Sequence, residues 1–412
     1  MIGNFVMRKK IKYQEPKLNK GKQKLNKEKK ALENYSTQLI DKTDIESVSE
    51  ALNSDFLSRG PKTDLFEKLL GDFCQNRNVI SVNSATSGLQ LSYQLLGVKN
   101  GSLIWTTPIT FVATANAALY LGARIDFVDI NADTLNVCPK LLECKLKLAK
   151  KNDNLPDIVT VVHFAGNPCE MEKIYNLSKE YGFLILEDAS HALGASIRNI
   201  PIGKSNYSSA SVFSFHPVKM ITTGEGGAVI LRSDNLVKKA KSLRSHGILN
   251  SEYFEDKPNW YYEQTELGSN YRMSELQAAL GSSQMKKLTQ FVKKRNSLAQ
   301  MYKDQLSDLP IKFQSVLETH VSSYHLFTIE ILEKTKTRDE LYFYLKQKNI
   351  GCQVHYIPVH LQPFYKHMGF SKGMFLNAEQ YFSRCLSLPL HQGLNQEHIE
   401  LVSRTLHNFF KN

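Results

Sequence analysis

Short apolar runs alternate with helical stretches through the first half of this chain, and this alternation constrains the fold more than any other feature. The strand-like runs lie at 79–82, 103–105, 125–128, 158–162 and 183–186, and the helical stretches at 41–52, 89–96, 110–121 and 171–181. Such alternation favours an α/β fold with a large, mostly parallel sheet and helices on both faces. Ligands of these sheets bind beyond the carboxyl ends of the strands, so the residues after each run are the candidates for chemistry.

A helix-rich stretch at 273–302 follows the alternating region, with apolar residues at helical spacing. It predicts a link to a smaller C-terminal α+β domain. We therefore expect a basic, disordered tail at 1–34, a large domain at 35–290 and a small domain at 291–412.

The positive charge of the chain is concentrated at its start. The net charge is +12, and residues 1–30 hold eleven Lys or Arg against two Glu, which accounts for nine of the twelve charges. The rest of the chain has no basic helix with interleaved aromatic residues, so we expect no nucleic-acid partner. A regulator that binds nucleic acid through the tail is the alternative from another class, and its affinity would fall steeply with salt.

Cysteine usage and hydropathy argue against disulfide-stabilised, metal-binding and membrane-spanning proteins. The six cysteines are scattered and form no Cys-x-x-Cys pair, which is typical of a reduced compartment, and metal-ligand spacing is absent. No apolar run is long enough to cross a bilayer. We expect a cytoplasmic protein without a metal or a membrane partner.

Two motifs place reactive groups beside apolar segments. Asp188 follows the run at 183–186, and a carboxylate at a strand end needs a partner, which by itself is more often structural than chemical. Lys219 stands between Val218 and Met220, where an apolar setting disfavours the ammonium, lowers the pKa and supplies the neutral amine that attacks an aldehyde.

A third motif, Asn-Ser-Ala-Thr-Ser-Gly at 83–88, joins a strand to a helix. Its hydroxyls and free N–H groups suit a phosphate, although an ordinary helix cap is the alternative for this segment alone. A phosphate site, Asp188 and Lys219 are together the three anchors that pyridoxal phosphate needs, with Asp188 keeping the ring nitrogen protonated. Phe111 would lie beneath the ring, unless it is a core aromatic on its helix.

The motifs resemble those of the DegT/DnrJ/EryC1/StrS sugar aminotransferases, pyridoxal-phosphate enzymes of fold type I, over roughly 35–410. The matching stretches are Asp-Phe-Leu-Ser-Arg-Gly-Pro at 55–61, the 83–88 motif, Thr-Pro-Ile-Thr-Phe-Val-Ala-Thr-Ala-Asn at 107–116, Glu-Asp-Ala-Ser-His-Ala-Leu-Gly at 187–194, Ser-Phe-His-Pro-Val-Lys at 214–219 and Gly-Ser-Asn-Tyr-Arg-Met at 268–273.

The resemblance implies a role for individual residues. Lys219 matches the lysine that carries the cofactor and shuttles protons, Asp188 the partner of the ring nitrogen, and His191 the residue near the ring hydroxyl. The residues that match phosphate ligands are Ser84, Ala85, Thr86, Ser214 and Asn270. Asn270 would come from a neighbouring subunit, which implies a homodimer with shared active sites.

Within the family, the chain most resembles the enzymes of pseudaminic acid biosynthesis, which move an amine from L-glutamate to C4 of a UDP-linked 4-keto-6-deoxy-N-acetylhexosamine. His355, Tyr356 and Arg272 are the expected substrate residues. Ser269 and Asn167 depart from the residues usual in relatives, which leaves GDP- or dTDP-linked sugars, and amination at C3, as alternatives. A dehydratase of the family would have histidine in place of Lys219.

Overall fold

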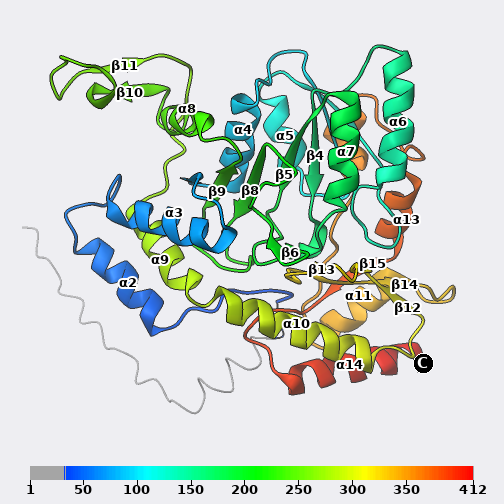
Figure 1. The fold of residues 1–412 in the computed structure, drawn as a ribbon. Helices are drawn as coiled ribbons and strands as arrows, with labels where there is room; N and C mark the ends of the chain where they lie inside the picture. Colours follow the sequence, from blue (N-terminus) through cyan, green and yellow to red (C-terminus); the bar gives the residue numbers. More distant parts are fainter. Residues whose placement is uncertain (1–31, 33, 412) are drawn as a thin grey trace, which may run out of the picture.

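The computed structural model describes residues 32 and 34–411, and most of the predicted basic tail lies outside this part (Figure 1). A seven-stranded sheet forms the centre, with the order β1-β9-β8-β5-β4-β2-β3. The strands are β1 (Val79–Val82), β2 (Leu103–Thr106), β3 (Arg124–Phe127), β4 (Ile158–Val162), β5 (Leu184–Asp188), β8 (Ala210–Ser214) and β9 (Gly227–Leu231). From β3 to β8 neighbouring strands run parallel, whereas β9 runs antiparallel to both β8 and β1.

Helices cover both faces of this sheet, as the alternation predicts (Figure 1). One face carries α4 (Ala85–Leu95), α5 (Ala113–Leu119) and α8 (Asn235–Leu243); the other carries α6 (Pro139–Lys151), α7 (Met171–Tyr181), α3 (Pro61–Cys74) and α9 (Glu275–Met285). Burial on both faces explains why β4 is apolar at nearly every position. The fold class predicted from the sequence, a fold type I arrangement with a large, mostly parallel sheet, is confirmed.

Two predicted helices have different bounds. The helix expected at 89–96 begins at Ala85, because Ser84 caps it. The helix expected at 110–121 is shorter, at Ala113–Leu119, and Phe111 precedes it with 59% of its surface exposed. The alternative of Phe111 as a core aromatic on a helix is therefore wrong.

A second core lies in the C-terminal third. It contains an antiparallel sheet of β12 (Ile311–Phe313), β14 (Phe327–Ile331) and β15 (Cys385–Leu388), covered by α10 (Leu288–Gln305), α11 (Arg338–Gln347) and α14 (Gln396–Lys411). Residue 290, the predicted boundary, falls inside α10, so that helix is shared by both parts. Leu32, within the predicted tail, is buried in this core, and its carbonyl accepts the Gly351 N–H at 2.5 Å.

The remaining elements lie around these two cores. They are α2 (Lys42–Leu52), β6 (Ser196–Ile197), β7 (Ile200–Pro201), β10 (Ile248–Asn250), β11 (Tyr262–Gln264), β13 (His320–Val321), α12 (Pro363–Lys366), α13 (Leu376–Arg384) and the 3-10 turns η1 (Phe164–Gly166), η2 (Ser251–Tyr253) and η3 (Val359–Leu361). The β10–β11 hairpin stands away from the body of the molecule (Figure 1). Within the described part of the chain, no helix has the length and apolar character to span a membrane.

Candidate active site

A cavity of about 470 Å³ opens at the carboxyl ends of the central strands. Among its lining residues are ten that the sequence singles out: Ser84, Ala85, Thr86, Phe111, Asp188, His191, Ser214, Lys219, His355 and Tyr356. It also contains residues that the sequence did not indicate, including Tyr35, Ser190 and His325. The motifs that are separate in the sequence therefore meet in one place.

Lys219 lies in the loop between β8 and β9, where its N–H donates to the His216 carbonyl at 2.9 Å. Its Nζ atom is 3.5 Å from Nε2 of His325. Burial lowers the pKa of Lys219 to about 8, while the Asp188 carboxylate opposes this shift. The structure thus provides an amine that is partly neutral near physiological pH, as its apolar neighbours predict.

Asp188 is the last residue of β5 and is buried. Its Oδ2 accepts a hydrogen bond from the Thr114 hydroxyl at 2.6 Å, and its Oδ1 accepts one from the Ser190 N–H at 3.1 Å. No Arg, Lys or His of the described chain lies within ion-pair distance of it. A structural carboxylate would ordinarily be held by an arginine, and no arginine holds this one; its side-chain donor is Thr114, in the first turn of α5.

Glu187 points to the opposite side of β5, because side chains alternate along a strand. It accepts hydrogen bonds from His163 Nε2 at 2.7 Å, from Ser211 at 3.0 Å and from Ser208. Desolvation opposes the ionised form of Glu187, but these bonds and the His163 ring hold its pKa below the usual range. This buried network fixes the strand that presents Asp188 to the cavity.

The 83–88 motif forms the N-terminus of α4 at the cavity wall. Ser84 caps the helix by accepting the Ser87 N–H at 3.1 Å, which leaves the first-turn N–H groups of Ala85 and Thr86 without an intrahelical partner. Gly227 lies against this turn: a Cβ there would be 2.6 Å from the Ala85 nitrogen. Only glycine allows β9 to support the loop so closely, and the result is an anion site at a helix N-terminus.

Two of the predicted histidines are buried and neutral. His191 accepts the Ala165 N–H at Nδ1 (3.2 Å), so its proton is on Nε2, which lies 3.2 Å from the Tyr356 hydroxyl. Burial lowers the pKa of His191 well below its usual value and that of His355 to about 3. The His355 ring packs edge-on against Tyr35, with 4.9 Å between ring centroids, so segments from both ends of the chain meet at the cavity.

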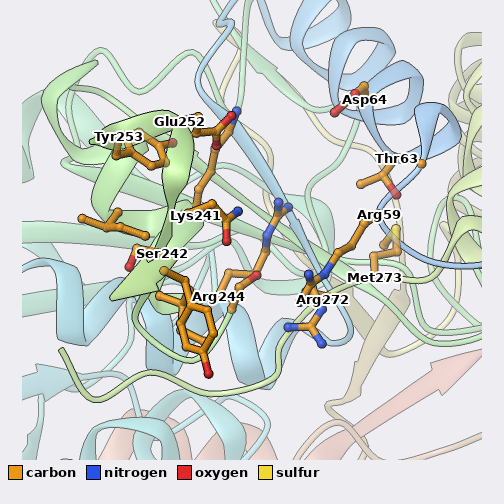
Figure 2. A pocket seen from close by; sticks show the side chains of 16 residues that line it. Arg59, Thr63, Asp64, Lys241, Ser242, Arg244, Glu252, Tyr253, Arg272 and Met273 are labelled. Atoms are coloured by element: carbon orange, nitrogen blue, oxygen red, sulfur yellow. The ribbon is translucent and has the colours of Figure 1, made fainter. Parts of the chain in front are cut away.

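The other two predicted residues do not line this cavity. Asn270 is exposed, and its carbonyl accepts a hydrogen bond from the Asn83 side chain at 3.2 Å. Arg272 lines a second cavity of about 430 Å³ together with Arg59 and Arg244 (Figure 2). Desolvation, followed by the charges of these two arginines, lowers the pKa of Arg272, and its buried Nη1 has no partner among the described residues. Lys241 also lines this second cavity, so four basic side chains face two carboxylates, Asp64 and Glu252, and the excess of positive charge suits an anionic group.

The residues around the first cavity fit pyridoxal phosphate. The α4 N-terminus would hold the phosphate, Asp188 the ring nitrogen and Lys219 the aldehyde carbon. The unpaired first-turn N–H groups and the close support from Gly227 carry this fit, because they form a phosphate site that an ordinary cap would not require. In the described residues, no group of three His, Cys, Asp or Glu side chains is arranged to hold a metal ion.

Known proteins resemble this chain over most of its length. The model of the DegT/DnrJ/EryC1/StrS aminotransferase family matches residues 38–407. A UDP-4-amino-4,6-dideoxy-N-acetyl-beta-L-altrosamine transaminase from Campylobacter jejuni is 40% identical over 374 residues, covering 90% of this chain and 96% of its own.

Two solved structures extend the comparison. PseC of Helicobacter pylori, described as an aminotransferase involved in the biosynthesis of pseudoaminic acid, has a TM-score of 0.84 at 34% identity and covers 92% of this chain and 98% of its own. Spr1654 of Streptococcus pneumoniae in its PLP form has a TM-score of 0.82 at 25% identity, with 91% and 98% covered.

Proposed function

The chain belongs to the DegT/DnrJ/EryC1/StrS aminotransferase family, whose members use pyridoxal phosphate, and from this premise we propose that it moves an amine from L-glutamate to C4 of a UDP-linked 4-keto-6-deoxy-N-acetylhexosamine. One observation carries the proposal: the Lys219 amine and the Asp188 carboxylate share one cavity with an anion site at the start of α4. The proposed place of the reaction is pseudaminic acid biosynthesis, which is the pathway given for the Helicobacter pylori relative.

The chemistry is divided between cofactor and protein. When bound, pyridoxal phosphate supplies an electron sink that stabilises negative charge at the carbon that loses a proton. Asp188 would hold a proton on the ring nitrogen, and the hydrogen bonds from Thr114 and Ser190 fix the orientation of its carboxylate. The neutral Lys219 amine would take the α-proton of glutamate, and the ammonium so formed would return it, on the same face, to the carbon that carried the aldehyde.

The second half of the reaction uses the same lysine in the reverse sense. Lys219 would now deliver a proton to the carbon C4 of the sugar, which takes the amine, so one stereocentre forms from one face. Two unlike substrates therefore use one site in turn, which gives ping-pong kinetics. The nucleotide supplies binding energy far from the reacting carbon, and the nucleotide-free sugar is expected to have a low kcat/KM.

The substrate residues are proposed from their position. Tyr356 lines the cavity, contacts His191 and lies beside Phe111, with 6.3 Å between ring centroids. The arginines of the second cavity suit a carboxylate or a diphosphate.

A homodimer would bring that second cavity to the active site of a partner copy, together with Asn270. The apolar surface beside the second cavity and on the projecting hairpin supports the proposal of a homodimer. The exposed residues there are Phe56, Leu57, Trp260, Tyr262 and Leu267, of which Leu267 is 83% and Trp260 77% exposed. Patches of this kind mark association surfaces.

A two-stage experiment tests the proposed function. The yellow enzyme is treated with L-glutamate alone, and we expect its absorbance to shift to that of the aminated cofactor, with release of 2-oxoglutarate. Addition of the UDP-linked 4-keto sugar should restore the first spectrum and yield a 4-amino sugar by mass and NMR. Recovery only with a 3-keto sugar, or only with GDP- or dTDP-linked sugars, would overturn the C4 and UDP assignments. No spectral change with any amino donor would favour a cofactor-binding regulator.

A further inference from the structure

His325 is the one residue of the cavity wall for which the sequence gives no signal and which reaches the Lys219 amine. It is 2% exposed and precedes β14, and its Nε2 lies 3.5 Å from Nζ of Lys219. Its other ring nitrogen, Nδ1, is buried and has no hydrogen-bond partner among the described residues. A buried nitrogen without a partner destabilises the fold. Among the described residues, the hydrogen bond that this ring makes is therefore the one between its Nε2 and Lys219.

The position of His325 is fixed from several sides. Arg295, which is fully buried in α10, donates from Nη1 to the carbonyls of Tyr324 and His325, both at 3.1 Å. The flanking residue Ser323 donates its hydroxyl to the His191 carbonyl at 2.8 Å. The His325 ring also packs on that of His191, with 4.4 Å between centroids. The imidazole therefore has little freedom to leave the lysine.

Burial, more than the charges around it, keeps the ring neutral. The groups that face it are Lys219, His191, Arg295 and His355, and burial is the largest cause that lowers the pKa of His325 well below its usual value. A neutral imidazole presents either a lone pair or an N–H at Nε2, depending on its tautomer. At this position it can accept from the ammonium of Lys219 or donate to the neutral amine.

We propose that His325 is a positioning residue that holds the ε-amine of Lys219 in both of its protonation states. A proton shuttle must alternate between the two states without leaving its place, and a partner that serves as acceptor and donor meets this need. This inference rests on the role proposed above for Lys219. It adds a residue that acts through the lysine and not on the substrate.

The test compares three variants by the titration of Lys219 in cofactor-free protein. Trace acetylation with acetic anhydride over a series of pH values, read at the Lys219 peptide by mass spectrometry, reports the neutral amine. The wild-type midpoint is expected at about 8. In His325→Phe, loss of the acceptor for the ammonium should lower the midpoint by about one pH unit, because hydrogen bonds to charged groups are the stronger ones. His325→Gln, whose amide both accepts and donates, should stay near the wild type.

His360→Gln is the matched control. His360 is fully buried, has its Nε2 3.0 Å from Glu379 and, like His325, has no partner for Nδ1 among the described residues. The titration midpoint of Lys219 in His360→Gln should equal that in the wild type. With the cofactor bound, His325→Phe should lower kcat by roughly 10- to 100-fold with little change in KM, and His325→Gln should recover most of it. An unchanged or raised midpoint in His325→Phe would overturn the proposal.

Wild-type protein gives a second measurement if the Phe variant does not fold. With ¹⁵N-labelled histidine, the two ring signals of His325 should exchange tautomer character as the pH passes the Lys219 midpoint, and constant signals would contradict the proposal. Borohydride reduction of the loaded protein separates the two hypotheses. If Lys219 is not labelled in the wild type, the proposed function fails. If it is labelled but the titration of His325→Phe is unchanged, only the role of His325 fails.

Discussion

Thr114 donates a 2.6 Å hydrogen bond to Oδ2 of Asp188, although 74 residues separate them in the chain. The Thr114 hydroxyl in turn lies 2.8 Å from that of Thr110 and accepts from it, because its own proton is used on the carboxylate. The site therefore contains a neutral donor at the place where a structural carboxylate would have an arginine. Such a donor orients Asp188 and leaves its charge available to the cofactor.

Replacement of Thr114 by valine should slow the reaction without preventing cofactor binding. Valine keeps the shape but leaves one carboxylate oxygen without its donor. A hydrogen bond to a charged group contributes ~1.5–3 kcal/mol, so we expect kcat to fall by roughly 10- to 150-fold. Steady-state kinetics at saturating cofactor measures this. Thr107→Val is the matched control, since the buried Thr107 hydroxyl has no partner in the described chain. Equal losses in the two variants would contradict the role of Thr114.

Cofactor uptake by the cofactor-free protein should rise with pH through about 8. The pKa of Lys219 is lowered to about 8, and only the neutral amine attacks an aldehyde. At pH 7 about one molecule in ten is then reactive, compared with roughly one in 3,000 for an ordinary lysine. Stopped-flow absorbance over pH 6–10 measures the midpoint. Asp188→Asn should move it lower, because the carboxylate favours the ammonium; a midpoint near 10 would show that burial does not lower the pKa.

Arg295→Met should destabilise the protein. Arg295 donates to the carbonyls of Tyr324, His325 and Leu390, and its loss leaves these buried acceptors unpaired at ~1–3 kcal/mol each, so we expect a cost of about 3 kcal/mol after the gain from removing a buried charge. Urea unfolding measures it. The exposed Arg404 provides the control as Arg404→Met, expected within about 0.5 kcal/mol of the wild type. A small effect of Arg295→Met would show that other contacts hold the segment.

Mixed dimers should reveal whether active sites are shared. Lys219→Ala and Arg272→Ala are each expected to be inactive, because each removes a group from every site of a homodimer. After unfolding and refolding as an equal mixture, half the dimers are mixed, and one of their two sites is intact, so about a quarter of the wild-type activity should return. No recovery would place Lys219 and Arg272 in sites of one chain. The unmixed variants, refolded separately, are the control.

Removal of the basic tail should be tolerated up to Leu32 and not beyond. A chain that starts at Ala31 is expected to keep the wild-type Tm and turnover. A chain that starts at Glu33 loses the buried Leu32, whose burial contributes ~1.5–3 kcal/mol, and should melt several degrees lower. Thermal unfolding followed by circular dichroism distinguishes the two. A large fall in turnover for the first truncation would indicate that the tail has a role in the reaction.

Local pattern was sufficient for the parts of the site that follow strands. Asp188, Ser84 and Lys219 each stand beside an apolar run, and the strand ends of a parallel sheet meet at one edge, so their convergence could be predicted. The antiparallel direction of β9 could not be predicted, because a run of buried apolar residues is compatible with a strand of either direction. The exposure of Phe111 was also beyond the pattern, since helical spacing does not fix where a helix begins.

The residues that the sequence did not indicate reach the site through tertiary contacts. His325 and Lys219 are 106 positions apart, and nothing in the Ser-Ser-Tyr-His-Leu-Phe segment at 322–327 distinguishes its histidine from an ordinary buried one. Thr114 resembles any threonine on a helix until Asp188 is placed opposite. Residues such as Thr114 and His325, which contact the reactive groups from other elements, are positioned by the packing of whole elements. A sequence periodicity describes only one helix or strand at a time.

The contact between Tyr35 and His355 has a consequence for biosynthesis of the enzyme. During translation, Lys219 and the 83–88 motif emerge long before the segment that contributes His355 and Tyr356. The nascent chain therefore passes through a stage in which the cavity lacks the walls formed by these two residues. Contacts across such sequence distances form late in folding. A ligand that binds only the native state stabilises that state. Uptake of the cofactor after release from the ribosome would therefore stabilise the contact between the segments of Tyr35 and His355.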